Sequence, residues 1–356
     1  MSTSEPTARF QPGDPVPWFV AETDQIAEFQ FSTAAGRYVL LAFLGSSTAP
    51  GAADARSIIR AAQAEGLLQN GFATALLVTT DPNDGSNAPG KPARLHDEPP
   101  GIRVLRDHAR VITEAFSATA GLSLLLDPML RVLAARPLAQ TEELVQLLRS
   151  KRGPQQAAEA PPAPVLLLPR VLEPELCQSL ITHYQTQGGI DSGFMQDAAG
   201  RSIAVLDAGH KRRRDCTIAD PALVTSLSQR IGGRLVPEIY KAFQFHVTQI
   251  ERFIVACYAA ADGGHFRPHR DNTTKATAHR RFAVSINLND DFDGGDLVFP
   301  EFGARRYRPT VGGAIVFSCG LMHEATRVSR GVRFATLPFL HDDAAERIRQ
   351  ESLRFV

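Results

Sequence analysis

The sequence predicts two domains of different class, an α/β layered domain over residues 8–150 and an antiparallel β-sandwich or barrel over residues 165–356. Three observations support this. The chain has 356 residues, which is too long for one ordinary core. Residues 151–164, KRGPQQAAEAPPAP, have the Pro- and Ala-rich composition of a linker. The apolar patterns before and after this segment differ.

The first part alternates between strand and helix signals, which is typical of an α/β fold. Short apolar runs have the length of buried strands, and the stretches between them have helical composition. Two runs flank Asp127–Pro128 and predict a hairpin. In chain order, the predicted elements are Tyr38–Leu44, Ala53–Leu68, Phe72–Thr79, the hairpin Leu122–Leu126 with Arg131–Ala135, and the helix Thr141–Ser150.

The second part begins with two helical stretches, Pro174–Thr186 and Ala222–Lys241. The pattern then changes to short apolar runs separated by Gly, Asp and Asn clusters, which favours antiparallel strands. The predicted strands are Ile250–Tyr258, Phe282–Leu288, Asp296–Phe299, Ala314–Ser318 and Val332–His341.

Composition and charge exclude several classes of protein. Apolar residues make up 44% and charged residues 21%, as in globular proteins, and the formal net charge is zero. No electrostatic feature therefore favours a nucleic acid or a membrane surface as partner. The N-terminus lacks the pattern of a signal peptide, and no apolar run is long enough to cross a bilayer, so we expect a cytoplasmic protein. The four cysteines, Cys177, Cys216, Cys257 and Cys319, show no zinc-binding spacing.

One motif carries chemistry. In HFRPHRD, residues 265–271, His269 and Asp271 are two residues apart, so on a strand their side chains face the same side and can bind one metal ion. His323, just after the strand Ala314–Ser318, can supply a third ligand. Two His and one carboxylate leave three positions open on an octahedral ion, as in non-haem Fe(II) oxygenases.

Arg333 lies ten residues after His323, on the next predicted strand. A dicarboxylate cosubstrate that chelates the metal at one end needs a cation at the other. The planar guanidinium of Arg suits this role, because it donates two parallel hydrogen bonds to a carboxylate. An HxD pair alone is a weak signal. The HxD pair followed in this order by the later His and the Arg is a specific signal of a metal centre that binds such a cosubstrate.

The segment from Tyr258 to Leu340 resembles the prolyl 4-hydroxylase branch of the Fe(II)- and 2-oxoglutarate-dependent dioxygenases. It contains YAAADGGHFRPHRD, RFAVSINLNDDFDGGDLVFPEFG and PTVGGAIVFSCGLMHEATRVSRGVRFATLPFL, which follow the family pattern in order. The resemblance implies a double-stranded β-helix (jelly-roll) with flanking helices. It also implies Fe(II), 2-oxoglutarate and O2, with a need for L-ascorbate left open.

Carried over to this chain, the resemblance implies that His269, Asp271 and His323 bind iron and that Arg333 binds 2-oxoglutarate. Tyr258 corresponds to a Tyr that hydrogen-bonds the same carboxylate, and Asn287 stands where some members have a second Tyr. The implied reaction is hydroxylation of an amino-acid side chain in a protein, peptide or small molecule, with release of succinate and CO2.

Residues 8–150 resemble the thioredoxin-like fold of peroxiredoxins, through QPGDPVPWF, GRYVLLAFL and LSLLLDPMLRVLAA. The family's active loop has the form Pro-x-x-x-Thr-x-x-Cys. This chain has LGSSTAPG instead, so if Thr48 aligns with the Thr, Gly51 takes the place of the cysteine. Residues 1–150 contain no cysteine, and peroxidase chemistry needs a thiolate. We therefore expect a non-catalytic module that mediates a protein interaction.

Two other functions are alternatives to the dioxygenase, a cysteine peroxidase and a non-catalytic binding protein with the oxygenase fold. The missing cysteine opposes the first, and the full set of His269, Asp271, His323 and Arg333 opposes the second. A basic run, His210–Arg214, could meet an acidic substrate or a nucleic acid, but its simpler interpretation is a solvated loop.

Overall fold

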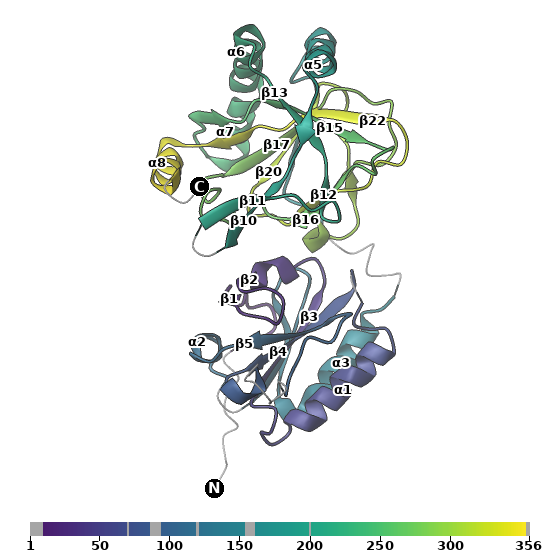
Figure 1. Cartoon of the computed structure of the whole chain (residues 1–356), viewed down its shortest axis with the longest axis vertical. Helices are drawn as coiled ribbons and strands as arrows, with labels where there is room; N and C mark the ends of the chain where they lie inside the picture. The colour runs from purple at the N-terminus through teal and green to yellow at the C-terminus, as the bar shows by residue number, and fades with distance from the viewer. Residues whose placement is uncertain are drawn as a thin grey trace. The chain divides into compact units, whose positions relative to one another are not determined.

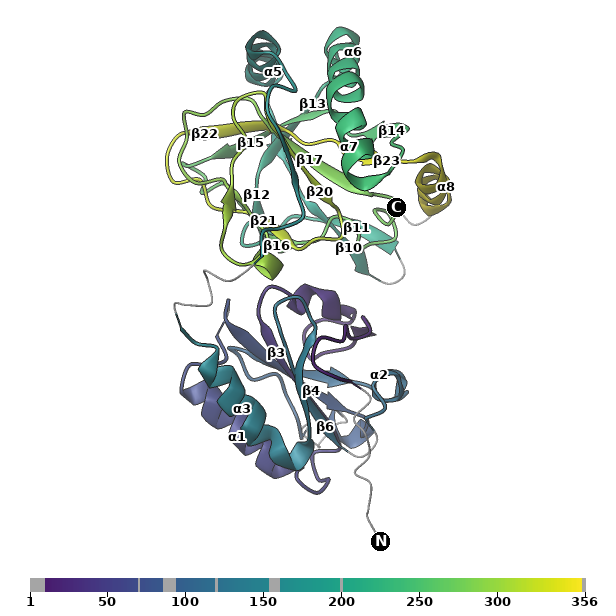
Figure 2. The ribbon, with the colours of Figure 1, turned by 180° about the vertical axis from the view of Figure 1, so that it is seen from behind.

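The computed structural model divides into two compact units. The first contains the described residues up to Pro161 together with Pro300–Gly303, and the second contains Pro162–Phe299 and the described residues from Ala304 onward. The structure describes residues 10–69, 71–85, 94–118, 121–153, 161–198 and 201–353. Residues 154–160 of the predicted linker lie outside this described part. Figures 1 and 2 show the course of the chain in each unit.

The first unit is built on a five-stranded mixed sheet of order β5-β4-β3-β6-β7. β4 pairs in parallel with β3 and β5, whereas β6 pairs antiparallel with β3 and β7. The elements are β1 (Val20–Ala21), β2 (Phe29–Gln30), β3 (Tyr38–Gly45), α1 (Ala52–Ala64), β4 (Ala73–Thr79), β5 (Ile102–Arg106), α2 (Val111–Ala115), β6 (Leu122–Leu126), β7 (Val132–Pro137) and α3 (Thr141–Ser150).

Helices α1 and α3 cover one face of this sheet, as Figures 1 and 2 show. Their apolar residues, such as Ile59 and Leu148, form one core cluster with residues of β3 and β4. β3 has six consecutive buried residues, as expected for a strand packed on both faces. The α/β prediction is confirmed for this unit, although β5 was not predicted.

The second unit contains two antiparallel sheets and the helices α5 (Pro174–Gln187), α6 (Pro221–Arg230), α7 (Val236–Phe243) and α8 (Asp343–Ser352). The larger sheet contains β8 (Leu166–Leu168), β9 (Ile190–Asp191), β13 (Arg214–Thr217), β14 (Gln249–Glu251), β15 (Ile254–Ala259), β17 (Phe282–Asn287), β20 (Ala314–Ser318), β22 (Val332–Thr336) and β23 (Phe339–His341). The smaller sheet has the order β12 (Lys211–Arg212), β16 (His265–His269), β21 (His323–Ala325), β18 (Leu297–Val298) and β19 (Arg306–Tyr307). A separate hairpin joins β10 (Phe194–Ala198) to β11 (Arg201–Val205).

The core of this unit lies between the helices and the larger sheet. Leu180 of α5, Leu227 of α6 and Ile239 of α7 pack in one cluster with Val255 and Ile286 of the sheet. The helices thus cover one face of the larger sheet. The predicted antiparallel pairing is confirmed throughout the described strands.

Two of the predicted strands are wrong in extent, because each is two strands. Ile250–Tyr258 breaks between β14 and β15 at Arg252, whose φ is +69°, a left-handed conformation that interrupts a strand. Val332–His341 breaks between β22 and β23, where Pro338 has no N–H to donate. The Arg252 guanidinium donates to the carbonyl of Leu337 at 2.9 Å, and this hydrogen bond connects the two breaks.

Candidate metal centre

The strands β16 and β21 bring the two predicted histidine ligands together. These strands pair antiparallel, and His269 stands directly opposite His323 in the register. The sequence had suggested that Asp271 lies on the same strand as His269. In the structure β16 ends at His269, and Asp271 lies two residues beyond its end. Asp271 is held there by its own N–H, which donates to the carbonyl of Cys319 at 3.0 Å. The structure therefore places all three predicted ligands at one point.

The separations within this triad fit a shared metal ion. Asp271 Oδ1 lies 3.6 Å from His269 Nε2, and Asp271 Oδ2 lies 3.3 Å from His323 Nε2. Both are longer than ordinary hydrogen bonds. Two atoms bound at right angles to one ion, each at about 2.1 Å, are separated by about 3 Å. The triad thus has the spacing of metal ligands that surround an ion.

The histidine tautomers also suit a metal. His269 Nδ1 donates to the carbonyl of Arg267 at 2.7 Å, and His323 Nδ1 donates to that of Leu321 at 3.1 Å. A carbonyl can only accept, so the ring protons must lie on Nδ1, which leaves the lone pair of each Nε2 for a metal. Phe266 stacks on His269 with ring centroids 3.4 Å apart and restricts the rotation of this ring.

The protonation states are those that metal binding requires. Burial, and next the charge of His323, lower the pKa of His269 to about 4. Burial alone would raise the pKa of Asp271, but His323 and His269 hold it well below its usual range. At neutral pH the centre therefore has a neutral imidazole at His269 and an ionised carboxylate at Asp271, which is a donor set for a divalent transition metal.

Arg333, on β22, is a buried cation with neutral neighbours. It is only 2% exposed. It donates to Ser285 Oγ at 2.7 Å and to Asn287 Oδ1 at 3.1 Å, and no carboxylate of a described residue forms an ion pair with it. A buried guanidinium without a counter-ion is unfavourable unless a ligand supplies the anion. Its surroundings therefore suit a cosubstrate carboxylate.

The glycine pair Gly294–Gly295, just before β18, leaves room for this side chain. Gly295 has a φ of +68°, and a Cβ added there would lie 3.0 Å from Arg333 Cδ. A larger residue would be strained by the backbone conformation and would press on the guanidinium stem.

Tyr258 and Asn287 both lie beside Arg333, but in different ways. Tyr258 is the cross-strand partner of Arg333, and the guanidinium carbon lies 5.4 Å from the centre of its ring. The amide of Asn287 accepts from Arg333 and donates to the carbonyl of Pro309 at 2.9 Å. Asn287 thus orients Arg333, and a direct contact of Asn287 with the cosubstrate stays a prediction.

Two functional residues were not found from the sequence. Ser285 lies two residues before Asn287 on β17, so the alternation of side chains on a strand could have indicated that both face Arg333. Arg213 donates to the Tyr258 hydroxyl at 3.4 Å and pairs with Asp215 at 2.6 Å. No local pattern distinguishes Arg213 from its exposed neighbours.

The interpretation of His210–Arg214 as a solvated loop is wrong. The run contributes to β12 and β13, and its side chains alternate between interior and surface because strand residues point to opposite faces. Lys211 and Arg213 are each 7% exposed, whereas Arg212 and Arg214 are exposed.

A second group of possible ligands, Glu251, His279 and His341, is a hydrogen-bonded network. His279 Nε2 lies 2.6 Å from Glu251 Oε2, closer than two ligands of one ion, and Arg280 donates to the other carboxylate oxygen at 2.8 Å. His341 Nε2 bonds Glu346 at 2.9 Å. His279 is thus a buried partner of Glu251.

In the first unit, the loop from Leu44 to Gly51 connects β3 to α1. Ser47 N–H donates to the buried carboxylate of Asp84 at 2.7 Å, and Thr79 Oγ1 donates to the same group at 2.6 Å. Gly51 precedes α1 with a φ of +77°. These contacts stabilise the loop and supply no nucleophile.

Comparisons with known proteins concern the second unit. Residues 253–341 match the 2OG-Fe(II) oxygenase superfamily. A PKHD-type hydroxylase from Caulobacter sp. (strain K31) is 33% identical over 82 residues, which are 21% of this chain and 36% of the relative. One from Pseudomonas putida (strain W619) is 25% identical over 123 residues, 31% of this chain and 54% of the relative. The chain thus spans between about a third and a half of the length of these relatives.

Two solved structures are also similar. A prolyl hydroxylase from Trichoplax adhaerens, in complex with a peptide fragment of the hypoxia inducible factor oxygen degradation domain, has a TM-score of 0.39 at 20% identity and covers 56% of this chain and 90% of its own. A Pseudomonas putida prolyl-4-hydroxylase has a TM-score of 0.37 at 18% identity and covers 52% of this chain and 95% of its own. Residues 253–341, which match the 2OG-Fe(II) oxygenase superfamily, contain the candidate triad as well as Tyr258, Asn287 and Arg333.

Proposed function

We propose that the second unit is an Fe(II)- and 2-oxoglutarate-dependent dioxygenase with a double-stranded β-helix fold, which hydroxylates an amino-acid side chain and releases succinate and CO2. The observation that carries this proposal is the triad of His269, Asp271 and His323, whose Nε2 atoms and carboxylate converge with tautomers and spacing suited to one ion. The match of residues 253–341 to the 2OG-Fe(II) oxygenase superfamily supports the same metal and cosubstrate.

In this proposal, His269, Asp271 and His323 hold Fe(II) on one side and leave the other side open for ligands. When bound, Fe(II), 2-oxoglutarate and O2 supply the oxidation of a C–H bond, coupled to decarboxylation of 2-oxoglutarate. Arg333 neutralises the far carboxylate of the cosubstrate, and Ser285 and Asn287 fix the direction of its guanidinium. The burial of Arg333 excludes water from this ion pair and so strengthens it.

Tyr258 is proposed to donate a hydrogen bond to the same carboxylate. Its hydroxyl accepts from Arg213, and a guanidinium can only donate. The phenolic proton is therefore available to a second partner. Tyr258 can thus donate this proton in a hydrogen bond to an anionic ligand.

Hydroxylation of a side chain is the favoured outcome because the matched relatives are named hydroxylases. The two competing functions fit less well. The thiols of Cys177, Cys216, Cys257 and Cys319 are all buried. Burial raises the pKa of Cys177 to about 11, which opposes the thiolate that a peroxidase requires. A binding protein has no need for a metal triad with preset tautomers.

For the first unit we propose a thioredoxin-like module without catalysis that mediates a protein interaction. Its support is the mixed five-stranded sheet with helices on one face, together with the absence of cysteine from residues 1–150. We place the beginning of the oxygenase domain at Pro162 and not at residue 165. The N–H of Ala163 donates to the Tyr307 hydroxyl at 2.9 Å, and Ala163 is buried.

The proposal is tested by anaerobic addition of Fe(II) and 2-oxoglutarate to the full chain. We expect the metal-to-ligand absorption band of a chelated 2-oxo acid, followed by succinate on exposure to O2. A protein that loads Fe(II) but gives neither the band nor succinate is not a 2-oxoglutarate oxygenase.

A further inference from the structure

Lys211 is a buried amine beside Phe266, to which the proposed mechanism gives no role. It stands opposite Phe266 in the pairing of β12 with β16. Its ammonium lies 4.8 Å from the centre of the Phe266 ring, and the same ring stacks on the metal ligand His269 at 3.4 Å. Lys211 and the proposed metal ligand His269 therefore contact the same aromatic ring.

Only the charges of Asp215 and Asp271, neither of which forms an ion pair with Lys211, favour its charged form. The ammonium donates to Ser192 Oγ at 2.8 Å and to the carbonyl of Gly193 at 2.5 Å, both neutral groups. The nearby Asp215 is already paired with Arg213. Among the described residues no carboxylate forms an ion pair with Lys211, so its charged form is costly in the absence of a ligand. Burial, and next the charge of Arg213, accordingly lower the pKa of Lys211 to about 6.

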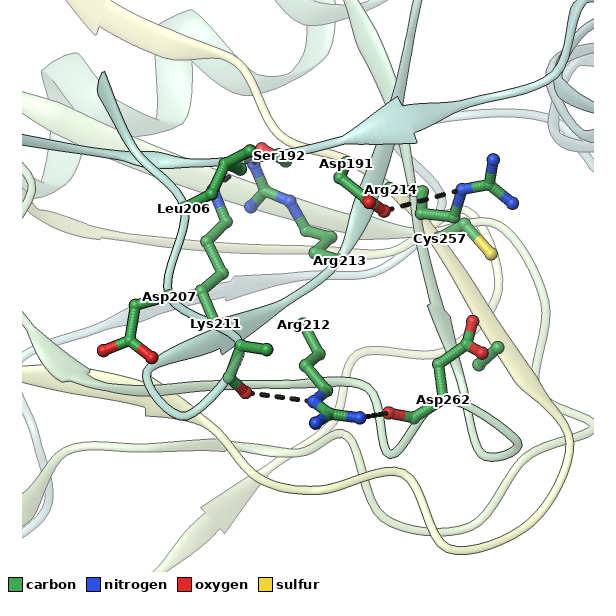
Figure 3. Close-up of a pocket in the computed structure, with 12 residues that line it drawn as sticks. Asp191, Ser192, Leu206, Asp207, Lys211, Arg212, Arg213, Arg214, Cys257 and Asp262 are labelled. Atoms are coloured by element: carbon green, nitrogen blue, oxygen red, sulfur yellow. Dashed lines mark hydrogen bonds and ion pairs between the residues drawn. The ribbon is translucent and has the colours of Figure 1, made fainter.

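A pocket of about 330 Å³ adjoins this side chain. Figure 3 shows residues that line it. Lys211 and Arg213 extend toward Ser192, whereas Arg212 extends toward the carbonyls of Ala208 and Asp262. The volume is sufficient for a small ligand or one side chain of a larger one. The residues that line the pocket are Asp191, Ser192, Leu206, Asp207, Ala208, Lys211, Arg212, Arg213, Arg214, Cys257, Ala259 and Asp262.

Two acidic residues of this lining, Asp191 and Asp207, interact with partners other than Lys211. Asp191 pairs with Arg214 at 3.8 Å, and Asp207 accepts from the N–H of Gly209 at 2.7 Å. Arg212 donates only to backbone carbonyls among the described residues. The pocket therefore holds one buried amine and one exposed guanidinium that form no ion pair with a carboxylate of a described residue.

We propose that Lys211 binds a carboxylate of the molecule that this enzyme oxidises, so that the substrate is an anionic amino acid or an acidic peptide segment. The inference rests on the proposed function for the reaction. The cosubstrate does not need this cation, since Arg333, with Ser285 and Tyr258, already provides for its far carboxylate. A substrate carboxylate at Lys211 would stabilise the charged amine and fix the position of the substrate in the pocket.

The test uses competitive labelling of lysines in the full chain with a trace of acetic anhydride at about pH 7.5, read by mass spectrometry. Only neutral amines react, so a bound anion that stabilises the charged form of Lys211 slows its labelling. The probe is acetate, and the matched neutral probe is acetamide, at equal ionic strength. Lys241, which is 74% exposed at its side chain, is the internal reference. Each probe is added to metal-free protein and to anaerobic protein loaded with Fe(II) and 2-oxoglutarate.

We expect acetate to slow the labelling of Lys211 on the order of tenfold, because a nearby anion favours the charged amine. Acetamide should not slow it, and the acetate effect should persist in the loaded protein. Equal labelling with acetate and acetamide overturns the proposal. An acetate effect that disappears in the loaded protein also overturns it, since Lys211 would then serve the cosubstrate. The absorption band of bound 2-oxoglutarate, recorded in the same samples, tests the proposed function separately from the labelling.

Discussion

Tyr258 and Arg333 are direct partners in the pairing of β15 with β22, and the guanidinium carbon of Arg333 lies 5.4 Å from the centre of the tyrosine ring. Side chains opposite each other in an antiparallel pair lie on the same face of the sheet. A phenol and a guanidinium 75 residues apart in the chain are thereby directed into one site.

Arg333→Ala should weaken 2-oxoglutarate binding on the order of 10² to 10³-fold. Loss of the cation leaves a buried carboxylate unpaired, which costs about 3 to 5 kcal/mol, and about 1.4 kcal/mol corresponds to a factor of ten. Arg333→Lys should lose less, because the charge remains. Anaerobic titration of the absorption band measures the affinity. Parent-like affinity in Arg333→Ala would mean that another residue binds the cosubstrate.

Ser285→Ala should weaken 2-oxoglutarate binding by about tenfold without changing the affinity for Fe(II). The serine hydroxyl accepts from the Arg333 guanidinium at 2.7 Å, and a hydrogen bond to a charged group contributes about 1.5 to 3 kcal/mol. Ser329→Ala, at an exposed position, is the matched control. The same titration applies, and an equal effect of both variants would contradict a specific role for Ser285.

His269→Ala and His323→Ala should each abolish 2-oxoglutarate turnover while the fold survives. Each change removes one of three metal ligands from paired strands whose backbone bonds remain. Equilibrium dialysis of Fe(II), succinate formation and circular dichroism distinguish lost metal from lost fold. Normal turnover by either variant would refute the metal centre.

A truncated chain that begins at Pro162 should fold, bind Fe(II) and consume 2-oxoglutarate without a second substrate. A chain that begins at Pro164 should unfold at a lower temperature, because it lacks the hydrogen bond from Ala163 to Tyr307, which contributes about 1 kcal/mol. Thermal unfolding compares the two. Equal stability would show that Ala163 adds nothing to the domain, and a folded but inert Pro162 chain would show that the reaction needs the first unit.

Acid should destabilise the metal-free protein between the ordinary His pKa of 6.5 and about 4, in part through His269. The folded state holds this imidazole neutral, whereas the unfolded state binds a proton in that range, so stability falls as the pH is lowered. One such group contributes a slope of at most about 1.4 kcal/mol per pH unit. Urea unfolding of His269→Gln should show a shallower dependence on pH than the parent. An identical slope would show that His269 is not held neutral.

The sequence by itself predicted the ligand set of the candidate site and the class of each domain. His269, Asp271, His323 and Arg333 could be recognised because residue type and order along the chain identify a ligand set. Likewise, apolar runs such as those of β3 and β20 could be recognised because the length and periodicity of a buried strand are local properties. The break at Arg252 was missed because its left-handed conformation has no local signature in a β-rich run.

Only the tertiary structure decided which polar residues surround that ligand set. Ser285 meets Arg333 across 48 residues, and Lys211 meets Phe266 across a pairing of two distant strands. The register of such pairs depends on packing of the whole core, and a shift by one residue would turn each side chain to the other face. For this reason the run His210–Arg214 appeared uniformly basic in the sequence, whereas the fold buries Lys211 and Arg213 and exposes their neighbours.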